Sequence, residues 1–345
     1  MSVTIIDIAK KAGVSPSTVS RVIADHPRIS SATKNKVIKI MKELNYHPNM
    51  IARSLASKSS RIIGVIIPGV AEKSFQHPFF PELLRGIGSI TYQHRYNILI
   101  SSVTSIEEEK ETIAQFARGG ITDGIILLTS RVKDPSVAEL VKMNFPFVII
   151  GRAEMETSVN WVDNDNYLIG YELTEHFISQ GHKRIVFLGL SPDFLVTADR
   201  FAGYKQALHD HGIPLDVSLV IESKFVTDDG YHLLKTLYSQ GKVKPTGIIA
   251  CDDLLAFGAI KYLNELGLSV PKDVAVAGVN NVPQAAYFSP ALTSIEINAF
   301  SLGLKAAEML LAEVDKGYSA GESHVRSYNR SIIPAELIVR ESTRK

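Results

Sequence analysis

Two hydrophobic patterns divide the chain at about residue 60. Before this point, short stretches place apolar side chains on one face of a helix, which predicts a small all-α unit. After it, brief β-branched runs alternate with longer amphipathic stretches, which is typical of parallel βαβ units. A length of 345 residues suggests two or three domains, so the pattern predicts a helical head joined to a larger α/β core.

Three helices are predicted in the head. The first lies in VTIIDIAKKA and ends at Gly13, because glycine adopts the left-handed conformation at little cost. Ser15 is a suitable N-cap and Pro16 a suitable first-turn residue for a second helix that reaches about Ala24. A third helix is expected over residues 31–44, with a lysine-rich outer face. Two short helices braced by a third form a helix-turn-helix module.

The second helix has the side chains of a DNA-reading helix. Ser17, Ser20 and Arg21 point outward, and an arginine can bind guanine O6 and N7 with two hydrogen bonds. The charge agrees, because residues 1–60 carry ten basic and three acidic groups, a net +7 in a chain of net +1. The remainder therefore carries −6, and a basic segment on an acidic body is typical of a phosphate-binding module. A plain three-helix packing module is the alternative.

The apolar runs of the core predict strands that are buried on both faces. They read IIGVIIP, YNILISS, DGIILLT, FPFVIIG, KRIVFLG, TGIIACDD and DVAVAGVN. Because ligands of open parallel sheets bind beyond the carboxyl ends of the strands, we expect a site in the loops that follow these runs.

These loops carry aromatic rings that can stack on the C–H faces of a saccharide. They also carry amide, carboxylate and guanidinium groups that can hydrogen-bond its hydroxyl groups. The expected saccharide-binding residues are Phe79, Phe80, Asp163, Phe194, Arg200, Phe225, Asp252 and Asn280. For any single aromatic residue, ordinary core packing remains an equal alternative.

A family resemblance rests on three groups of residues. TIIDIAKKAGVSPSTVSRVI and LNYHPNMIARSLAS resemble the N-terminal signature of the lactose-repressor (LacI/GalR) family of bacterial transcription regulators. PALTSIEINAFSLGLKAAEMLL and PAELIVREST resemble its closing segments, so the resemblance covers essentially the whole chain. HPFFPELLRGI, VDNDN and FLVTADRFAGY are most similar to the maltose and maltodextrin regulators of Gram-positive bacteria.

The resemblance implies a fold and a division into domains. The fold is a small all-α helix-turn-helix head plus an α/β core like the periplasmic binding proteins, with two parallel-sheet subdomains, three chain crossovers and an effector in the cleft. The expected boundaries are 1–48 for the DNA-binding domain, 49–60 for the hinge helix and linker, 61–161 with 292–322 for the core N-subdomain, and 162–291 with 323–345 for the core C-subdomain.

The resemblance also implies how DNA is contacted. The two residues with which the family contacts bases correspond to Pro16 and Ser17. Because Pro16 has no side-chain donor, Ser17, Ser20 and Arg21 are expected to recognise the base sequence. NMIARSLAS resembles the family's hinge helix, in which Leu55 would wedge into the minor groove. A core leucine of a linker helix is the alternative for Leu55. The expected DNA-binding residues are Thr4, Ile5, Ser15, Pro16, Ser17, Ser20, Arg21, Arg28, Ser30, Thr33, Tyr46, Asn49, Ala52, Leu55 and Ala56.

For the effector, motif matching places Phe79 and Phe225 at stacking positions and Arg200 at the effector-binding arginine. Asn280 stands where many members have an aspartate, which removes one negative charge from the site. The implied function is a transcriptional repressor of operator DNA that responds to a small saccharide, maltose or a maltodextrin. A global carbon-catabolite regulator that uses a phosphocarrier protein as corepressor is the alternative.

Two other classes of protein are disfavoured. An enzyme is disfavoured because no P-loop, His-Glu-x-x-His or Gly-x-Ser-x-Gly run occurs, so we expect no catalysis, no cofactor and no metal. A sugar-transport protein would need an export signal and would have no use for the basic head.

The setting follows from the same features. The chain has a single cysteine, Cys251, and no apolar run of the about 18 residues that would span a bilayer. We therefore expect a cytoplasmic protein without membrane contact. The chain stops at RESTRK without the heptad tail of the family's tetramers, so a homodimer is expected.

Overall fold

The computed structural model describes residues 3–23, 26–46, 59–68, 75–128, 131–154, 158–223, 229–239, 241, 244–315 and 328–344. Of the expected site residues, Asn49, Ala52, Leu55, Ala56 and Phe225 lie outside these ranges. Within the ranges, no helix combines the length and hydrophobicity that a membrane span requires.

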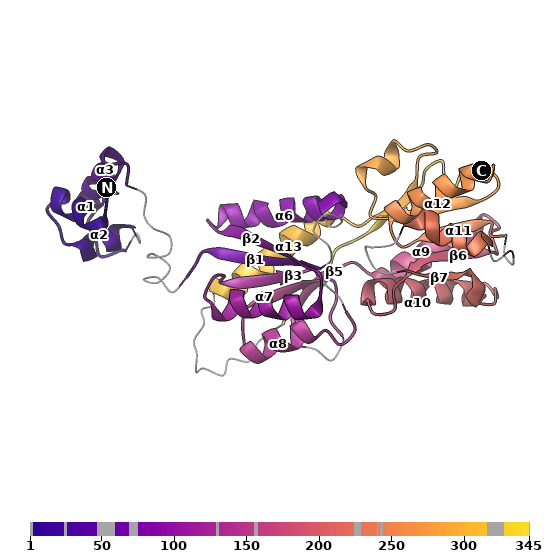
Figure 1. Ribbon diagram of the computed structural model, residues 1–345, viewed down its shortest axis with the longest axis horizontal. Helices are drawn as coiled ribbons and strands as arrows, with labels where there is room; N and C mark the ends of the chain where they lie inside the picture. The colour runs from indigo at the N-terminus through magenta and orange to yellow at the C-terminus, as the bar shows by residue number, and fades with distance from the viewer. Residues whose placement is uncertain are drawn as a thin grey trace.

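Three helices form the head: α1 (Ile5–Ala12), α2 (Pro16–Ile23) and α3 (Ser31–Glu43) (Figure 1). Their inner faces share one small apolar cluster, formed by Ile8, Ala9, Ala12, Val19, Val22, Val37 and Ile40. Gly13 ends α1 with φ 64°, as predicted. The Ser15 hydroxyl accepts a hydrogen bond from the backbone N–H of Thr18 at 3.1 Å, which confirms its N-cap role.

The first half of the core is a six-stranded parallel sheet in the order β11-β5-β4-β3-β1-β2. Its strands are β1 (Ile62–Pro68), β2 (Asn97–Val103), β3 (Gly124–Leu127), β4 (Phe147–Ile150), β5 (Asn160–Asp163) and β11 (Arg330–Ile332). Helices α6 (Phe79–Gln93) and α13 (Ala299–Asp315) cover one face, and α7 (Ile106–Arg118) and α8 (Pro135–Met143) cover the other (Figure 1).

The second half repeats this plan in the order β12-β10-β9-β8-β6-β7. Its strands are β6 (Ile185–Leu190), β7 (Val220–Glu222), β8 (Gly247–Ala250), β9 (Ala275–Val279), β10 (Thr293–Glu296) and β12 (Glu336–Ile338). Helices α9 (Asn166–Ser179) and α10 (Leu195–Asp210) pack on one face, and α11 (Gly230–Ser239) and α12 (Asp253–Glu265) on the other. Two 3-10 turns, η1 (Val217–Leu219) and η2 (Pro283–Ala286), lie in its loops. The edge strand β12 is antiparallel to β10, and the other pairs are parallel.

The chain crosses between the halves three times, after β5, after β10 and after β11. The expected boundaries need correction at each crossing. Residue 161 lies inside β5, and β10 pairs with β9 of the second half although 292–322 was assigned to the first. Conversely, β11 pairs with β5 although 323–345 was assigned to the second half. Strand pairing therefore assigns β10 to the second half and β11 to the first half. Both strands are short, so the sequence pattern alone did not show which sheet they join.

Asn164 connects the three crossings. Its side-chain Nδ2 donates to the carbonyl of Ile297 at 3.0 Å and to the carbonyl of Ile333 at 2.8 Å. Asn164 follows β5, Ile297 follows β10 and Ile333 follows β11, so one buried amide touches all three connections. The backbone N–H of Ile333 also donates to the carbonyl of Asp163 at 2.8 Å. The crossings therefore form one hydrogen-bonded hinge.

Candidate saccharide cleft and DNA-contacting surface

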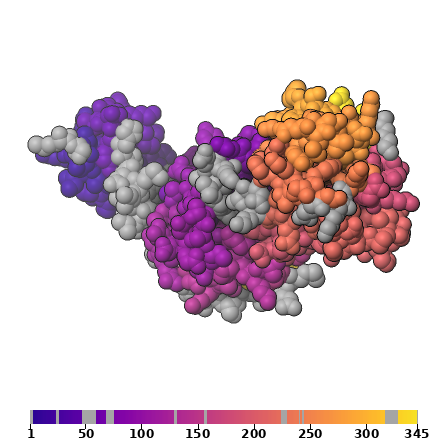
Figure 2. Space-filling view, turned by 45° about the vertical axis from the view of Figure 1, so that its right-hand side comes forward, coloured from indigo at the N-terminus to yellow at the C-terminus, as the bar shows by residue number. Residues whose placement is uncertain are grey.

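The two halves adjoin at the carboxyl ends of their strands, and Figure 2 shows the purple and magenta first half against the orange second half. The expected polar residues gather here. Asp163 ends β5, Arg200 lies on α10, Asp252 caps α12 after β8, and Asn280 follows β9. Residues distant in sequence thus reach one region because parallel strands end at the same edge of a sheet.

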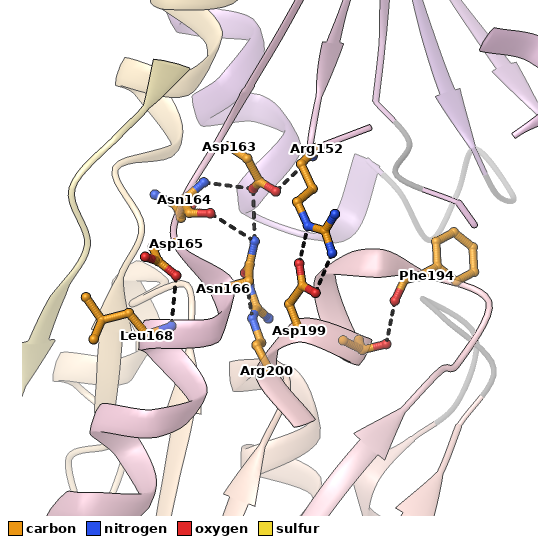
Figure 3. Close-up of polar contacts among 10 residues, drawn as sticks. Arg152, Asp163, Asn164, Asp165, Asn166, Leu168, Phe194, Asp199 and Arg200 are labelled. Carbon is orange, nitrogen blue, oxygen red and sulfur yellow. Dashed lines mark hydrogen bonds and ion pairs between the residues drawn. The ribbon is translucent and has the colours of Figure 1, made fainter. Parts of the chain in front are cut away.

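Arg200 is buried and held by two hydrogen bonds. Its Nε donates to Asn166 Oδ1 at 2.9 Å (Figure 3). Its Nη1 donates to the carbonyl of Cys251 at 2.7 Å. Glycines position it, since a Cβ on Gly170 would lie 1.9 Å from the Arg200 carbonyl and one on Gly203 would lie 2.0 Å from that of Tyr167. Only glycine permits α9 and α10 to pack this closely. Burial lowers the pKa of Arg200.

Asp163 is buried and already has partners on both oxygens. Oδ1 accepts from the backbone N–H of Asn164 at 2.8 Å and from Asn166 Nδ2 at 3.0 Å. Oδ2 accepts from the backbone N–H of Arg152 at 2.9 Å (Figure 3). Burial raises the pKa of Asp163 to about 6. The carboxyl group thus links the first crossing to Arg200 through Asn166.

Asp252 joins the halves through a histidine that the sequence reasoning missed. Asp252 Oδ2 lies 2.6 Å from His77 Nε2 and 2.6 Å from Asn280 Nδ2, and its Oδ1 accepts from the backbone N–H of Leu254 at 2.7 Å. His77 belongs to the first half and Asp252 to the second. The signal that could have found His77 is its place in HPFF, two residues before Phe79 in a loop that follows a predicted strand.

The expected aromatic residues have different surroundings. Phe79 is half-buried and packs against apolar clusters of both halves, so it lies at their junction. Phe80 is buried among core residues of the first half, the packing alternative that the sequence left open. Phe194 is half-buried at the edge of the cleft, where the guanidinium of Arg131 lies 5.8 Å from its ring centre.

A second group of contacts joins the halves at that edge. Arg152, which follows β4, forms an ion pair with Asp199 on α10 through both Nε and Nη2 (Figure 3). The hydrogen bond to Asp199 raises the pKa of Arg152. The backbone N–H of Val132 also donates to the carbonyl of Asp193 at 2.9 Å. The cleft is therefore bridged both at His77 and at Arg152.

In the head, the described residues of the expected DNA-binding set are exposed or half-buried. Ser17 and Arg21 are exposed on α2, whereas Val19 and Val22 of the same helix are buried. Each helix begins with a hydroxyl cap, from Thr4, Ser15 and Ser30 respectively, and all three capping residues are exposed. Helix N-termini favour phosphate groups, so the surface combines a polar helix face with phosphate-binding positions.

The linker between head and core joins β1 at a carboxylate. Asp123, just before β3, accepts hydrogen bonds from Ser59 Oγ at 2.5 Å, from Ser60 N–H at 2.6 Å and Oγ at 2.8 Å, and from Arg61 N–H at 3.0 Å. Arg61 has φ 55°, a left-handed conformation that is uncommon outside glycine. Four donors on one carboxylate fix the direction in which the linker leaves the first half.

Known proteins match the chain over both parts. A model described as "Bacterial regulatory proteins, lacI family" matches residues 4–49, and one described as "Periplasmic binding protein-like domain" matches residues 174–343. The HTH-type transcriptional regulator MalR of Streptococcus pneumoniae serotype 4 is 39% identical over 313 residues, covering 90% of this chain and 92% of the relative. Catabolite control protein A of Priestia megaterium is 32% identical over 317 residues, covering 92% and 94%.

Solved structures agree with these matches. The "transcriptional regulator CelR-cellobiose complex" is 28% identical with a TM-score of 0.75, and 99% of each chain is covered. The lac repressor dimer bound to operator and the anti-inducer ONPF is 25% identical with a TM-score of 0.82, again over 99% of each chain. The predicted fold class, a helix-turn-helix head on a core like the periplasmic binding proteins, is confirmed.

Proposed function

We propose that the protein is a saccharide-controlled repressor. The chain belongs to the lacI family, and it is a DNA-binding regulator with a sugar-binding domain, not an enzyme. In this proposal it binds operator DNA as a homodimer in the cytoplasm. Maltose or a maltodextrin is the effector that changes its operator affinity.

The convergence of Arg200, Asp252 and Asn280 at the junction of the halves carries the proposal. A guanidinium, a carboxylate and an amide provide both donors and acceptors for hydroxyl groups, and Phe79 provides an apolar ring beside them. The 39% identity to a regulator named MalR supports maltose as the saccharide. The complex of CelR with cellobiose supports a disaccharide in a core of this architecture.

The exposed face of α2 supports binding in a major groove. We propose that Ser17, Ser20 and Arg21 contact base edges and that the hydroxyl caps of the head contact phosphates. A phosphate-binding head should give a steep fall of log affinity with log salt concentration. A slope near zero would contradict this role.

An apolar patch on the second half supports the homodimer. Phe257 of α12 and Phe288 stack with ring centres 4.5 Å apart, and Tyr287 beside them is 90% exposed. Phe257 and Phe288 are half-buried, so an exposed tyrosine lies beside a partly exposed aromatic pair, a combination typical of protein interfaces. We propose that a second copy of the chain covers this patch.

Titration of the full-length chain on operator DNA tests the proposal. Maltose and maltotriose should change operator affinity, whereas ribose and cellobiose serve as controls for saccharide selectivity. A shift of the melting temperature by the same sugars gives an independent measure of binding. If no saccharide moves either quantity, the effector assignment is wrong.

The proposed hinge wedge, Leu55 with Ala52 and Ala56, is tested separately because these residues lie outside the described ranges. Leu55→Ala should weaken operator binding about tenfold or more, since a side chain inserted at a base step stabilises the bent duplex. Saccharide binding should not change. Unchanged operator affinity would exclude the wedge.

The similarity to catabolite control protein A favours a second candidate, a global regulator with a protein corepressor. A phosphocarrier protein would then raise operator affinity, and maltose would have no effect. The same operator titration distinguishes the two functions.

A further inference from the structure

We propose that His77 is an internal substitute for the effector, which must be displaced from Asp252 when a saccharide binds. This inference rests on the proposed function and adds the direction of the response. Because His77 and Asp252 belong to different halves of the core, effector binding breaks a contact between the halves and releases the operator.

The Oδ2 oxygen of Asp252 already has two donors in this structure. Oδ1 accepts from the backbone N–H of Leu254 at 2.7 Å and thereby caps α12. Oδ2 holds His77 Nε2 and Asn280 Nδ2, each at 2.6 Å. A saccharide hydroxyl that donates to Oδ2 therefore replaces one of these two donors.

His77 is the donor that can leave. Asn280 follows β9, and its backbone N–H donates to the carbonyl of Ile295 at 2.9 Å, so it moves with the second half. Asp252 lies in the same half. His77 approaches from the first half, and its contact with Asp252 is lost by a small relative movement of the halves.

In its tautomeric state, His77 offers Asp252 one hydrogen-bond donor, as a saccharide hydroxyl group would. His77 Nδ1 accepts from the backbone N–H of Phe79 at 3.2 Å, so Nε2 carries the proton that is donated to Asp252. A saccharide O–H offers the same single donor to the same oxygen. Burial lowers the pKa of His77, but the hydrogen bond and charge of Asp252 outweigh it and raise the pKa overall.

Aromatic contacts place the imidazole where a sugar would lie. Its ring centre is 6.4 Å from that of Phe79 and 6.0 Å from that of Phe80, both in edge-on arrangements. Phe79 is the ring proposed to stack on a saccharide. Departure of the imidazole thus frees the acceptor Asp252 Oδ2 for a saccharide hydroxyl beside that ring.

The direction of the response follows from the contacts that remain. The ion pair of Arg152 with Asp199 bridges the cleft separately from His77 and does not involve Asp252. Loss of the His77 contact alone then lets the first half turn about the hinge at Asn164, while the Arg152 ion pair is kept. Since the linker to the head is fixed on the first half at Asp123, this turn moves the linker and disfavours the DNA-bound arrangement.

Two variants that differ by one methylene test the proposal in the full-length chain. His77→Asn keeps an acceptor for the Phe79 N–H but is too short to reach Asp252. His77→Gln places an amide donor near the position of Nε2. Operator affinity without sugar, maltose affinity and thermal melting are measured for wild type and both variants.

His77→Asn should bind maltose about three- to tenfold more tightly and bind operator more weakly in the absence of sugar, because the net contribution of one hydrogen bond is lost from the competing contact. His77→Gln should resemble wild type in both respects. Weaker maltose binding by His77→Asn would show that His77 contacts the saccharide and would overturn the inference, as would unchanged affinity for both ligands.

The outcome separates this inference from the proposed function. If wild type binds maltose and His77→Asn gains no affinity, only the inference fails. If wild type binds no saccharide, the proposed function fails, and the sugar-free operator affinity of His77→Asn still shows whether the contact supports DNA binding.

Discussion

In both halves of the core a six-stranded sheet carries helices on both faces, and the strand orders correspond position by position. The second half presents Arg200, Asp252 and Asn280 from a helix, a helix cap and a strand end. The first half presents His77 and Arg152 from loops and receives the linker at Asp123. In the proposed function, the same architecture therefore serves saccharide binding in one half and communication with the head in the other.

This division has a physical basis in packing. Arg200 is fixed because α9 and α10 meet at two glycines, and a buried arginine with two hydrogen bonds has little freedom. The loop side chains of the first half touch the second half at single points, which can form and break. A rigid binding face opposite a face with breakable contacts is what a ligand-controlled switch requires.

The largest effect is expected from breaking the binding face. Arg200→Met should abolish detectable maltose binding, at least about a hundredfold loss, and lower the free energy of unfolding by about 2–4 kcal/mol, because Asn166 and the Cys251 carbonyl lose a buried donor. Calorimetric titration and urea unfolding measure the two effects. Lys205→Met, an exposed change on the same helix, is the control. Maltose binding within threefold of wild type would contradict the assignment.

A smaller effect is expected from breaking the linker attachment of the first half. Asp123→Asn replaces an oxygen acceptor with an amide donor opposite residues 59–61. Maltose affinity should stay unchanged, while the maltose-induced change in operator affinity should shrink about tenfold, within the usual range of coupling energies. Operator titrations with and without maltose measure this.

Glu139→Gln is the matched control for Asp123→Asn, because Glu139 lies on α8 of the same half and its carboxylate pairs with Arg118 of α7 at 3.0 Å. Equal loss of response in both variants would mean that the first half is destabilised generally. A wild-type response in Asp123→Asn would remove Asp123 from the coupling.

The smallest effect is expected on the pH dependence of stability. Burial raises the pKa of Asp253, in the second half, to about 8. The folded chain therefore keeps a proton that the unfolded chain releases near pH 4, so the free energy of unfolding falls as the pH rises toward 8. Between pH 7 and pH 8 we expect a fall of about 1 kcal/mol, below the limit of about 1.4 kcal/mol per pH unit for one proton because Asp253 itself begins to ionise in this range.

Urea unfolding at pH 6, 7 and 8 measures this slope, and Asp253→Asn should reduce it. The variant keeps an acceptor for the Ser294 hydroxyl or for the Val282 N–H. A slope equal to that of wild type would place the titrating group elsewhere.

Local features of the molecule were predictable from the sequence. Gly13 and Ser15 act within one turn of the chain, so their residue types suffice to place a helix end and a helix start. The buried strands have an uninterrupted apolar signature, which marked most of both sheets and the loops after them. Arg200 could be singled out because it stands in a motif, DRFAGY; the structure shows it buried, and its saccharide contact stays a prediction.

Features that depend on distant partners were not predictable. The strands β11 and β12 have three residues each with partly exposed side chains, and they exist because they pair with β5 and β10. His77 meets a carboxylate 175 positions away, and Asp123 meets donors 62 to 64 positions away. A polar side chain in a loop has no periodicity from which such a partner can be deduced.

The two hydrogen bonds of Asn164 limit the mechanics of the core. Because a planar amide fixes its two N–H directions at a constant angle, the Ile297 and Ile333 carbonyls keep a constant separation while the amide holds both. These bonds oppose sliding of the three connections past one another and favour rotation of the halves about a region near Asn164. Displacements at different places in the junction of the halves would then be converted into the same rotation.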